Sequence, residues 1–215
     1  LEVGGQGKLN GLSDYRVTAA LAGRNIAFRD GKVRLSNIQV SSKLLADSRS
    51  IELNALTIRT GQGQVNGSVA LEDLTRYRAK LNLGRVDLRR LLDSATSREV
   101  AYAGMISGPF EVTGNLKNSS SLTAVARLNI TPQSGGVPVS GNINVDYDGP
   151  KDTVNLGRSF VALPSSRLDF SGALGSQLDV HLVSRNLQDF QPALDLTSNS
   201  PVMLPVQLEQ GGIVQ

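Results

Sequence analysis

The side chains that usually carry catalysis are sparse in this chain. His181 is the only histidine and there is no cysteine, which excludes an HExxH zinc site, a thiolate nucleophile and a Cys-ligated zinc. Residues 104–108 (GMISG) miss the pattern of a nucleophile elbow, because the serine comes one place late. Gly61-x-Gly63 lacks the third glycine and the following helix of a dinucleotide loop, and it predicts a hairpin turn. We therefore expect a protein that is not an enzyme and uses no cofactor.

The carboxylates of Asp146, Asp148 and Asp152 cluster around a predicted turn. A calcium site needs six or more oxygens from an ordered loop, and the twelve-residue pattern of such a loop does not follow. We expect no metal site here. His181 falls on the polar side of a predicted strand, where we expect a solvated histidine.

The composition favours an aliphatic protein that does not bind nucleic acid. The 22 basic and 19 acidic residues are interspersed and give a net charge of +3, whereas nucleic-acid binders usually show a concentrated basic stripe. There is no Trp, and there are only five Phe and four Tyr, too few for base-stacking platforms. A β-sandwich core normally uses large aromatic side chains. Apolar burial therefore falls on Val, Ile, Leu and Ala, which make a smooth, shallow surface.

One strand pattern occurs twice. Residues 33–40 (VRLSNIQV) and 51–58 (IELNALTI) both alternate apolar and polar positions, with one extra residue in the middle, Asn37 or Ala55. Alternation places the apolar side chains on one face of a strand. An extra residue restores the phase after a slip, as a β-bulge does, and bends the strand. We predict two similar bent strands with one apolar face each.

Much of the chain keeps this alternation. Short strands joined by tight turns indicate an antiparallel all-β protein with one face towards water. The strands that we predict are 8–11, 15–29, 32–42, 50–60, 63–71, 76–84, 102–107, 109–116, 121–131, 137–147, 152–157, 159–163, 166–174, 177–184 and 203–208. The residues that we expect to line the apolar face are Val17, Ala19, Leu21, Val33, Leu35, Ile38, Val40, Ile51, Leu53, Leu56, Ile58, Leu81, Leu83, Phe110, Val112, Leu122, Leu128, Ile130, Ile143, Val145, Leu168, Phe170, Leu178, Val180 and Leu182.

Two segments break the β pattern and divide the chain. Residues 86–92 and 187–194 each follow a strand and are long enough for a turn or two of helix. Each comes after an apolar-polar-Gly element, at 65–67 and at 170–172. We predict two related β units, 1–95 and 96–197, and the start of a third at 198–215, since internal repeats favour a stacked architecture. The alternative is a single sandwich.

Both ends of the chain suggest a segment of a longer protein. The sequence has no initiator Met, opens in strand-like alternation and stops where the pattern predicts the start of a new strand. No run reaches the ~20 apolar residues that a membrane span needs. We expect any targeting signal or membrane anchor to lie outside this segment.

Several longer runs resemble the bacterial TamB family, whose members are the inner-membrane-anchored subunits of the translocation and assembly module. These runs are GGVPVSGNINVDYDG (135–149), VNLGRSFVALPSSRLDFSGALG (154–175) and LDVHLVSRNLQDFQPAL (178–194). VNGSVAL (65–71), YRAKLNLGRVDLRRLL (77–92) and GMISGPFEVTGNL (104–116) resemble the related AsmA-like repeats. The resemblance covers nearly the whole chain and rests on a repeat style, not on one invariant motif.

The resemblance implies a fold, a place and a role. The implied fold is all-β, a long antiparallel sheet curled into an open apolar trough (β-taco-like) with one or two short helices. The implied role is that of a bridge-like lipid transfer protein: phospholipid acyl chains pass along the trough between the inner and outer membranes, in support of outer-membrane protein assembly and secretion. The implied location is the periplasm, with the membrane anchor and the contact with an outer-membrane assembly partner outside this chain.

Elementary energetics agree with such a role. Exposing one CH₂ group to water costs ~0.8 kcal/mol, so a sixteen-carbon tail costs on the order of 13 kcal/mol. A continuous aliphatic strip removes most of that cost without a tight site. Two other functions stay open at this point, a structural or adhesin-like β module with a dry core and a lipopolysaccharide-bridge-like jelly roll that binds a glycolipid.

Overall fold

The computed structural model describes residues 2–9, 15–30, 33–61, 63–96, 101–193 and 212–214. Strands dominate these ranges: β1 (Glu2–Leu9), β2 (Tyr15–Asp30), β3 (Val33–Asp47), β4 (Ser50–Thr60), β5 (Gly63–Glu72), β6 (Arg76–Asp87), β7 (Tyr102–Asn115), β8 (Asn118–Pro132), β9 (Val137–Pro138), β10 (Ser140–Asp148), β11 (Thr153–Ala162), β12 (Ser166–Leu174), β13 (Leu178–Ser184) and β14 (Gly212–Val214). The helical elements are α1 (Leu88–Thr96) and the 3₁₀ turns η1 (Gly149–Lys151) and η2 (Leu187–Phe190).

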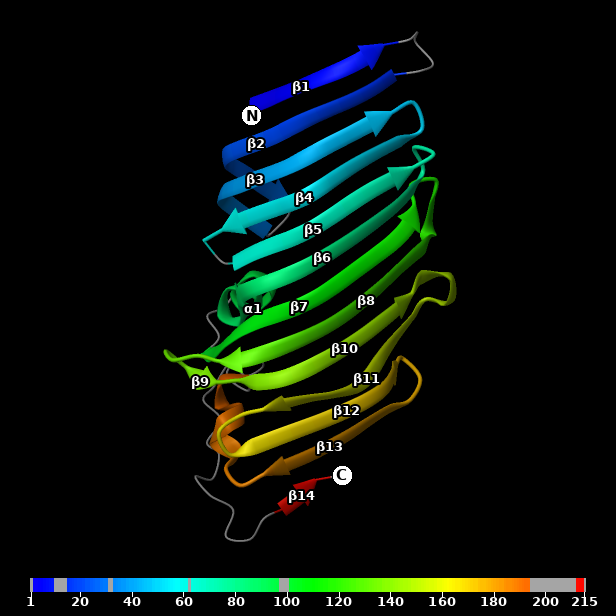
Figure 1. Cartoon of the computed structure of the whole chain (residues 1–215). Coiled ribbons are helices and arrows are strands. Elements are labelled where there is room, and N and C mark those ends of the chain that lie inside the picture. Colours follow the sequence, from blue (N-terminus) through cyan, green and yellow to red (C-terminus); the bar gives the residue numbers. More distant parts are fainter. Residues whose placement is uncertain are drawn as a thin grey trace. The chain divides into compact units, whose positions relative to one another are not determined.

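The strands form one sheet in which each strand pairs with its neighbour along the chain (Figure 1). The exception is β9, which lies off this path and pairs in parallel with β7. The sheet is otherwise antiparallel and does not close on itself. The predicted all-β class, the long antiparallel sheet and the short helices are therefore confirmed.

The chain divides into two compact units, each made of more than one segment. Unit 1 comprises Leu1–Arg85, Gly108–Ala126 and Tyr147–Asp152, and unit 2 comprises Val86–Ser107, Arg127–Asp146 and Thr153–Gln215. The division into sequence repeats at 95 and 197 stays a prediction.

The two predicted bulges are present. Leu53 lies opposite Val69 and Leu56 lies opposite Gly67, so β4 contains one residue more than β5 over this stretch. Ala55 is in the left-handed region with φ of 50°, and Asn37 in β3 has φ of 55° at the matching register shift against β2. The extra residue returns the alternation to its phase, as the sequence pattern indicated.

Two strands that we predicted as pairs of shorter strands are continuous, so this part of the prediction was wrong. β7 runs through Gly108 and Pro109, and β11 runs through Gly157 and Arg158. Gly-Pro is a usual breaking signal, but Gly108 adopts a φ of 137° and the strand continues. Conversely, the predicted strand 137–147 is divided into β9 and β10. The predicted strand 203–208 lies outside the described residues.

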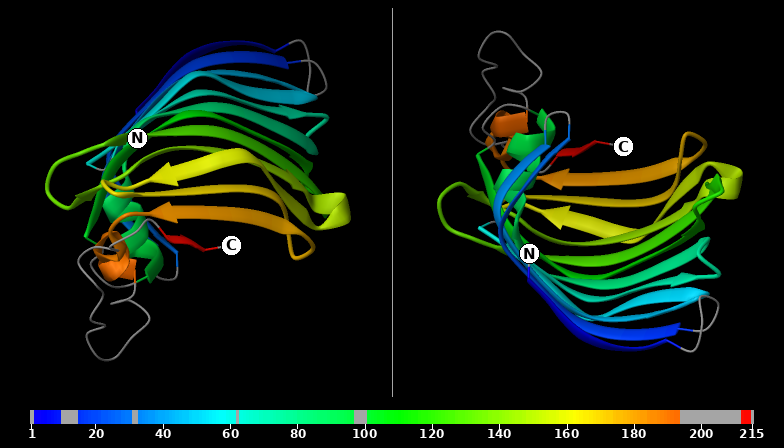
Figure 2. Two further views of the ribbon diagram at one scale, coloured as in Figure 1. Left: turned by 90° about the horizontal axis from the view of Figure 1, so that it is seen from below. Right: turned by 90° about the horizontal axis from the view of Figure 1, so that it is seen from above.

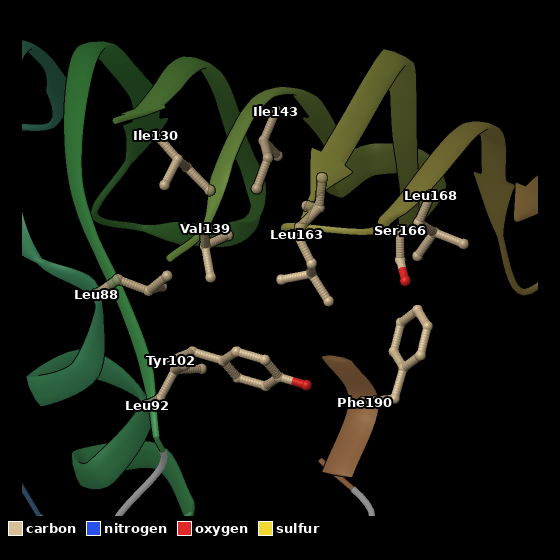
Figure 3. A pocket seen from close by; sticks show the side chains of 11 residues that line it. Leu88, Leu92, Tyr102, Ile130, Val139, Ile143, Leu163, Ser166, Leu168 and Phe190 are labelled. Atoms are coloured by element: carbon tan, nitrogen blue, oxygen red, sulfur yellow. The ribbon is translucent and has the colours of Figure 1, made fainter. Parts of the chain in front are cut away.

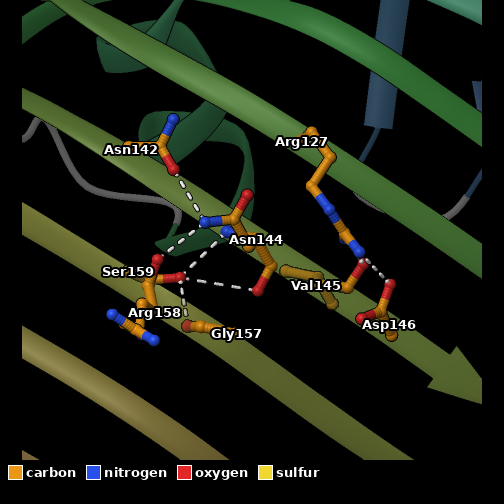
Figure 4. A network of polar contacts seen from close by, with 8 residues as sticks. All are labelled: Arg127, Asn142, Asn144, Val145, Asp146, Gly157, Arg158 and Ser159. Atoms are coloured by element: carbon orange, nitrogen blue, oxygen red, sulfur yellow. Dashed lines mark hydrogen bonds and ion pairs between the residues drawn. The ribbon is translucent and has the colours of Figure 1, made fainter.

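β11 contains a bulge whose backbone groups are hydrogen-bonded by side chains of unit 2. The register against β12 shifts between Leu156 and Ser159. The Ser159 hydroxyl accepts the backbone N–H of Asn144 at 2.9 Å and donates to the Gly157 carbonyl at 2.8 Å (Figure 4). The Asn144 side chain donates to the carbonyl of Arg158 at 2.7 Å. Buried backbone groups need partners, and these side chains replace the ladder bonds that the bulge removes.

Both predicted helical segments are confirmed, and both belong to unit 2. The Asp87 carboxylate accepts the backbone N–H of Arg89 at 2.9 Å at the start of α1, and the Asn186 side chain accepts that of Gln188 at 3.0 Å at the start of η2. Such caps satisfy N–H groups that lack a partner in the first turn. α1 and η2 lie side by side in both views of Figure 2.

Candidate apolar binding site

In unit 1, the sheet register brings the predicted apolar residues into rows. Residues directly opposite each other on paired strands share one face of the sheet. One row crosses five strands: Ala19, Leu44, Leu53, Val69 and Ala79. A second row contains Val40, Ile58, Val65 and Leu83, and a third contains Leu56, Gly67 and Leu81.

The apolar face of unit 1 is only partly covered. Ala19, Ile38 and Leu56 are buried, but Val40, Leu53, Ile58, Leu81 and Leu83 are half-buried and Ile51 is 37% exposed. Among the residues whose side chains are described, no large hydrophobic side chain has less than 2% of its surface exposed. A closed core would bury such side chains completely. This face therefore has aliphatic surface left for a ligand.

In unit 2, apolar side chains line a partly open pocket with a volume of about 260 Å³ (Figure 3). Its lining is almost entirely aliphatic and aromatic. The lining residues are Leu88, Leu92, Tyr102, Ile130, Val139, Ile143, Val161, Leu163, Ser166, Leu168 and Phe190.

Three elements position this lining. Leu88 and Leu92 lie one helical turn apart on α1 and so share one face of it. Ile130 and Ile143 come from strands of the sheet, and Phe190 comes from η2. Figure 3 shows the α1 side chains and Phe190 on different sides of the pocket, with the strand residues between them. The pocket thus depends on packing both α1 and η2 against the sheet.

The hydroxyl groups in the lining are already engaged. The Ser166 hydroxyl donates to the Asp189 carboxylate at 2.8 Å and lies 2.8 Å from the Ser184 hydroxyl. The Tyr102 phenol donates to the backbone carbonyl of Asp189 at 3.0 Å. Since both hydroxyl groups have partners within the protein, the pocket offers little to a polar group and suits an aliphatic chain.

Burial changes the titration of the phenol. Partial burial raises the pKa of Tyr102 above its ordinary value, and the nearby Asp189 charge raises it further, while a hydrogen bond from the backbone of Ala193 acts in the opposite direction. The neutral phenol is the form that the folded protein favours.

The predicted lining residues differ in where the structure places them and in how exposed they are. Ile130, Ile143 and Leu168 line the pocket. Besides the half-buried residues of unit 1 given above, those outside the pocket are Val17, Leu21, Phe110, Val112, Leu122, Leu128, Val145, Phe170 and Leu182. Leu178 and Val180 on β13 are 40% and 48% exposed. The side chains of Val33 and Leu35 lie outside the described part of the chain. Which of these residues touch a ligand stays a prediction.

Sequence reasoning missed much of the pocket. Leu88 and Leu92 have helical spacing, which could have indicated a shared face. Tyr102 and Phe190 are among the chain's few aromatic residues, but alternation does not connect residues so far apart in sequence. Ser166 shows no signal, because a serine that follows a Pro-Ser turn is ordinary.

The other residues that the sequence singled out, His181 and Ser107, lie on strands. His181 lies opposite Asp169 and is exposed. A hydrogen bond from Arg167 holds the pKa of Asp169 below its usual value, and the charges of Arg167 and His181 lower it further. Ser107 lies within the continuous strand β7, not at a strand-to-helix turn.

The aspartates around the β10–β11 turn have individual partners. Asp146 pairs with Arg127 at 2.7 Å and Asp148 pairs with Lys151 at 2.9 Å. The Tyr147 phenol donates to Asp152 at 3.5 Å. Within the described ranges, no group of three or more His, Asp or Glu side chains is placed to hold a metal ion.

Comparison of the chain with protein-family models, with curated proteins and with solved structures finds no match in any of the three. Of the helices that the structure describes, none has the length and apolar character to cross a membrane.

Proposed function

We propose that this chain is a periplasmic segment of a TamB-like or AsmA-like protein and that its apolar face carries phospholipid acyl chains between the inner and outer membranes. The observation that carries the proposal is the set of aliphatic rows in unit 1, which are in register across successive strands and remain partly exposed. The pocket of unit 2 adds a second apolar surface with its hydroxyl groups engaged. Support for outer-membrane protein assembly belongs to the same proposal, through a partner outside this segment.

The energetics favour a strip of this kind over a tight site. A sixteen-carbon chain gains on the order of 13 kcal/mol when its CH₂ groups leave water. Rows of Leu, Val, Ile and Ala can cover such a chain at many equivalent positions, because dispersion and hydrophobic contacts have little directionality. A chain covered in this way can slide without crossing a large barrier.

The test is photo-crosslinking in cells that express the protein. A photoreactive amino acid replaces Leu53 or Leu81 on the apolar face. In the control it replaces Lys80, which is next to Leu81 on β6 but lies on the polar face. We expect phospholipid adducts by mass spectrometry at Leu53 and Leu81 and none at Lys80. Equal adducts at all three positions, or none, would contradict the proposal. Adducts with a glycolipid instead would favour the lipopolysaccharide-bridge alternative, and a face inaccessible to any lipid would favour the dry-core module.

A further inference from the structure

The η2 turn contains a carboxylate that is buried against the sheet. Asp189 is 7% exposed, and burying an ionised carboxylate is costly unless hydrogen bonds compensate it. The Asp189 carboxylate accepts the backbone N–H of Ser165 at 2.7 Å and the Ser166 hydroxyl at 2.8 Å, both on one oxygen. Ser165 and Ser166 stand where β12 begins, so a charge-assisted pair of hydrogen bonds ties η2 to that strand.

A second tie reaches the same residue from another strand. The Tyr102 phenol at the start of β7 donates to the backbone carbonyl of Asp189 at 3.0 Å. Asp189 is thus attached through its side chain to β12 and through its backbone to β7. The next residue, Phe190, lines the apolar pocket, so these attachments hold an aromatic ring at the pocket's edge.

The size of the pocket suits part of one aliphatic chain. A cavity of ~150 Å³ lined by aliphatic side chains takes up one benzene molecule. The present pocket of about 260 Å³ is larger and partly open, so a segment of an acyl chain can enter it while the rest of the lipid stays outside.

We propose that Asp189 is a positioning residue that controls how fast an acyl chain leaves the apolar pocket: its hydrogen bonds to Ser165 and Ser166 hold Phe190 at the pocket's edge, and their loss lets the chain leave faster. The inference rests on the proposed function, because the occupant is an acyl chain. The chain can belong to a free fatty acid, a lysophospholipid or a two-chain phospholipid, and these sources share the chemistry that the pocket recognises.

The test compares the purified protein with variants by the binding and release of three lipids that carry the same fluorophore: a fatty acid, a lysophospholipid and a two-chain phospholipid. We expect the unmodified protein to bind lipid with an acyl chain in this pocket and to release it slowly. Asp189→Ala should release the lipid about tenfold faster or more, as expected for losing hydrogen bonds to a charged group. Asp189→Asn keeps an acceptor oxygen and should restore slow release.

Three further variants make the result specific. Asp169→Ala removes an exposed carboxylate that is paired with Arg167, and it should behave like the unmodified protein. Tyr102→Phe removes one hydroxyl and keeps the ring, so it should accelerate release several-fold even if Asp189→Ala does not fold. Phe190→Trp introduces the chain's single tryptophan, whose emission should shift to the red when Asp189→Ala is added.

The outcomes separate the two proposals. If the unmodified protein binds none of the three lipids, the proposed function and this inference are both overturned. If it binds lipid but folded Asp189→Ala and Tyr102→Phe release each lipid at the unmodified rate, the role of Asp189 alone is overturned.

Discussion

Gly67 of β5 lies directly opposite Leu56 of β4. Leu56 is the residue that follows the bulged residue Ala55. On its other side Gly67 faces β6, where a Cβ atom would overlap the carbonyl oxygen of Lys80. Its φ of 156° adds to this constraint. The bend in β4 and the close approach of β6 therefore meet at a residue that has no room for a side chain, within the row that also contains Leu81.

Replacing Gly67 with Ala should destabilise the fold. The added Cβ would push the backbone of β6 away and disturb the aliphatic rows on either side, at a cost of roughly 1–3 kcal/mol in the free energy of unfolding. Gly4→Ala is the matched control, because a Cβ at Gly4 meets no atom within 4 Å. Urea unfolding of the two variants should show a lower midpoint for Gly67→Ala only. Equal midpoints would show that β6 can move without cost.

Replacing Ala55 with Gly, in contrast, should not lower the free energy of unfolding. Ala55 has a φ of 50°, which costs a residue with a Cβ roughly 1–2 kcal/mol. Glycine removes this strain but makes the unfolded chain more flexible, so we expect unfolding free energy to stay equal or rise by up to about 1 kcal/mol. Ala79→Gly, in a regular part of β6, should lower it by roughly 0.5–1 kcal/mol. A larger loss at Ala55 than at Ala79 would contradict the strained bulge.

The raised pKa of Tyr102 predicts a loss of stability in alkali. The folded state keeps the phenol protonated to a higher pH than the unfolded state does, because burial and the Asp189 charge disfavour the phenolate. Its contribution is complete below the ordinary tyrosine pKa of about 10 and is lost as pH rises through the folded-state value. Unfolding free energy should therefore fall more steeply above pH 10 in the unmodified protein than in Tyr102→Phe. Parallel curves would mean that Tyr102 titrates as a solvated phenol does.

The parts of the fold that follow from local pattern could be predicted from the sequence. The phase slips at Asn37 and Ala55 are visible as an extra residue within an apolar alternation, and the register shows a bulge at each. The continuation of β7 through Gly108 and Pro109 could not be predicted from the sequence. The pair has the composition of a turn, and only the pairing with neighbouring strands keeps it extended. The local sequence indicates which segments form strands, but pairing with neighbouring strands determines where each strand ends.

The candidate pocket could not be predicted from the sequence, for a related reason. Leu92 and Phe190 are almost a hundred residues apart, and they meet in one lining only because α1 and η2 pack on the sheet together. The attachment of Asp189 to Ser166 is equally non-local. Alternation in the sequence indicates which side of a strand is apolar, but it carries no information about which helix covers that side.

The most direct test of acyl-chain binding is lipid mass spectrometry on the purified protein and on two variants, Leu81→Asp and Lys80→Asp. A delipidated sample of each protein serves as the control. Leu81 stands in an aliphatic row, whereas Lys80 is exposed on the opposite side of the same strand. We expect near-stoichiometric phospholipid on the unmodified protein and on Lys80→Asp. Leu81→Asp should lose about tenfold or more of it, because an unpaired carboxylate would face the hydrocarbon. A stable protein that carries no lipid, or a folded Leu81→Asp variant that carries as much as the unmodified protein, would contradict the account.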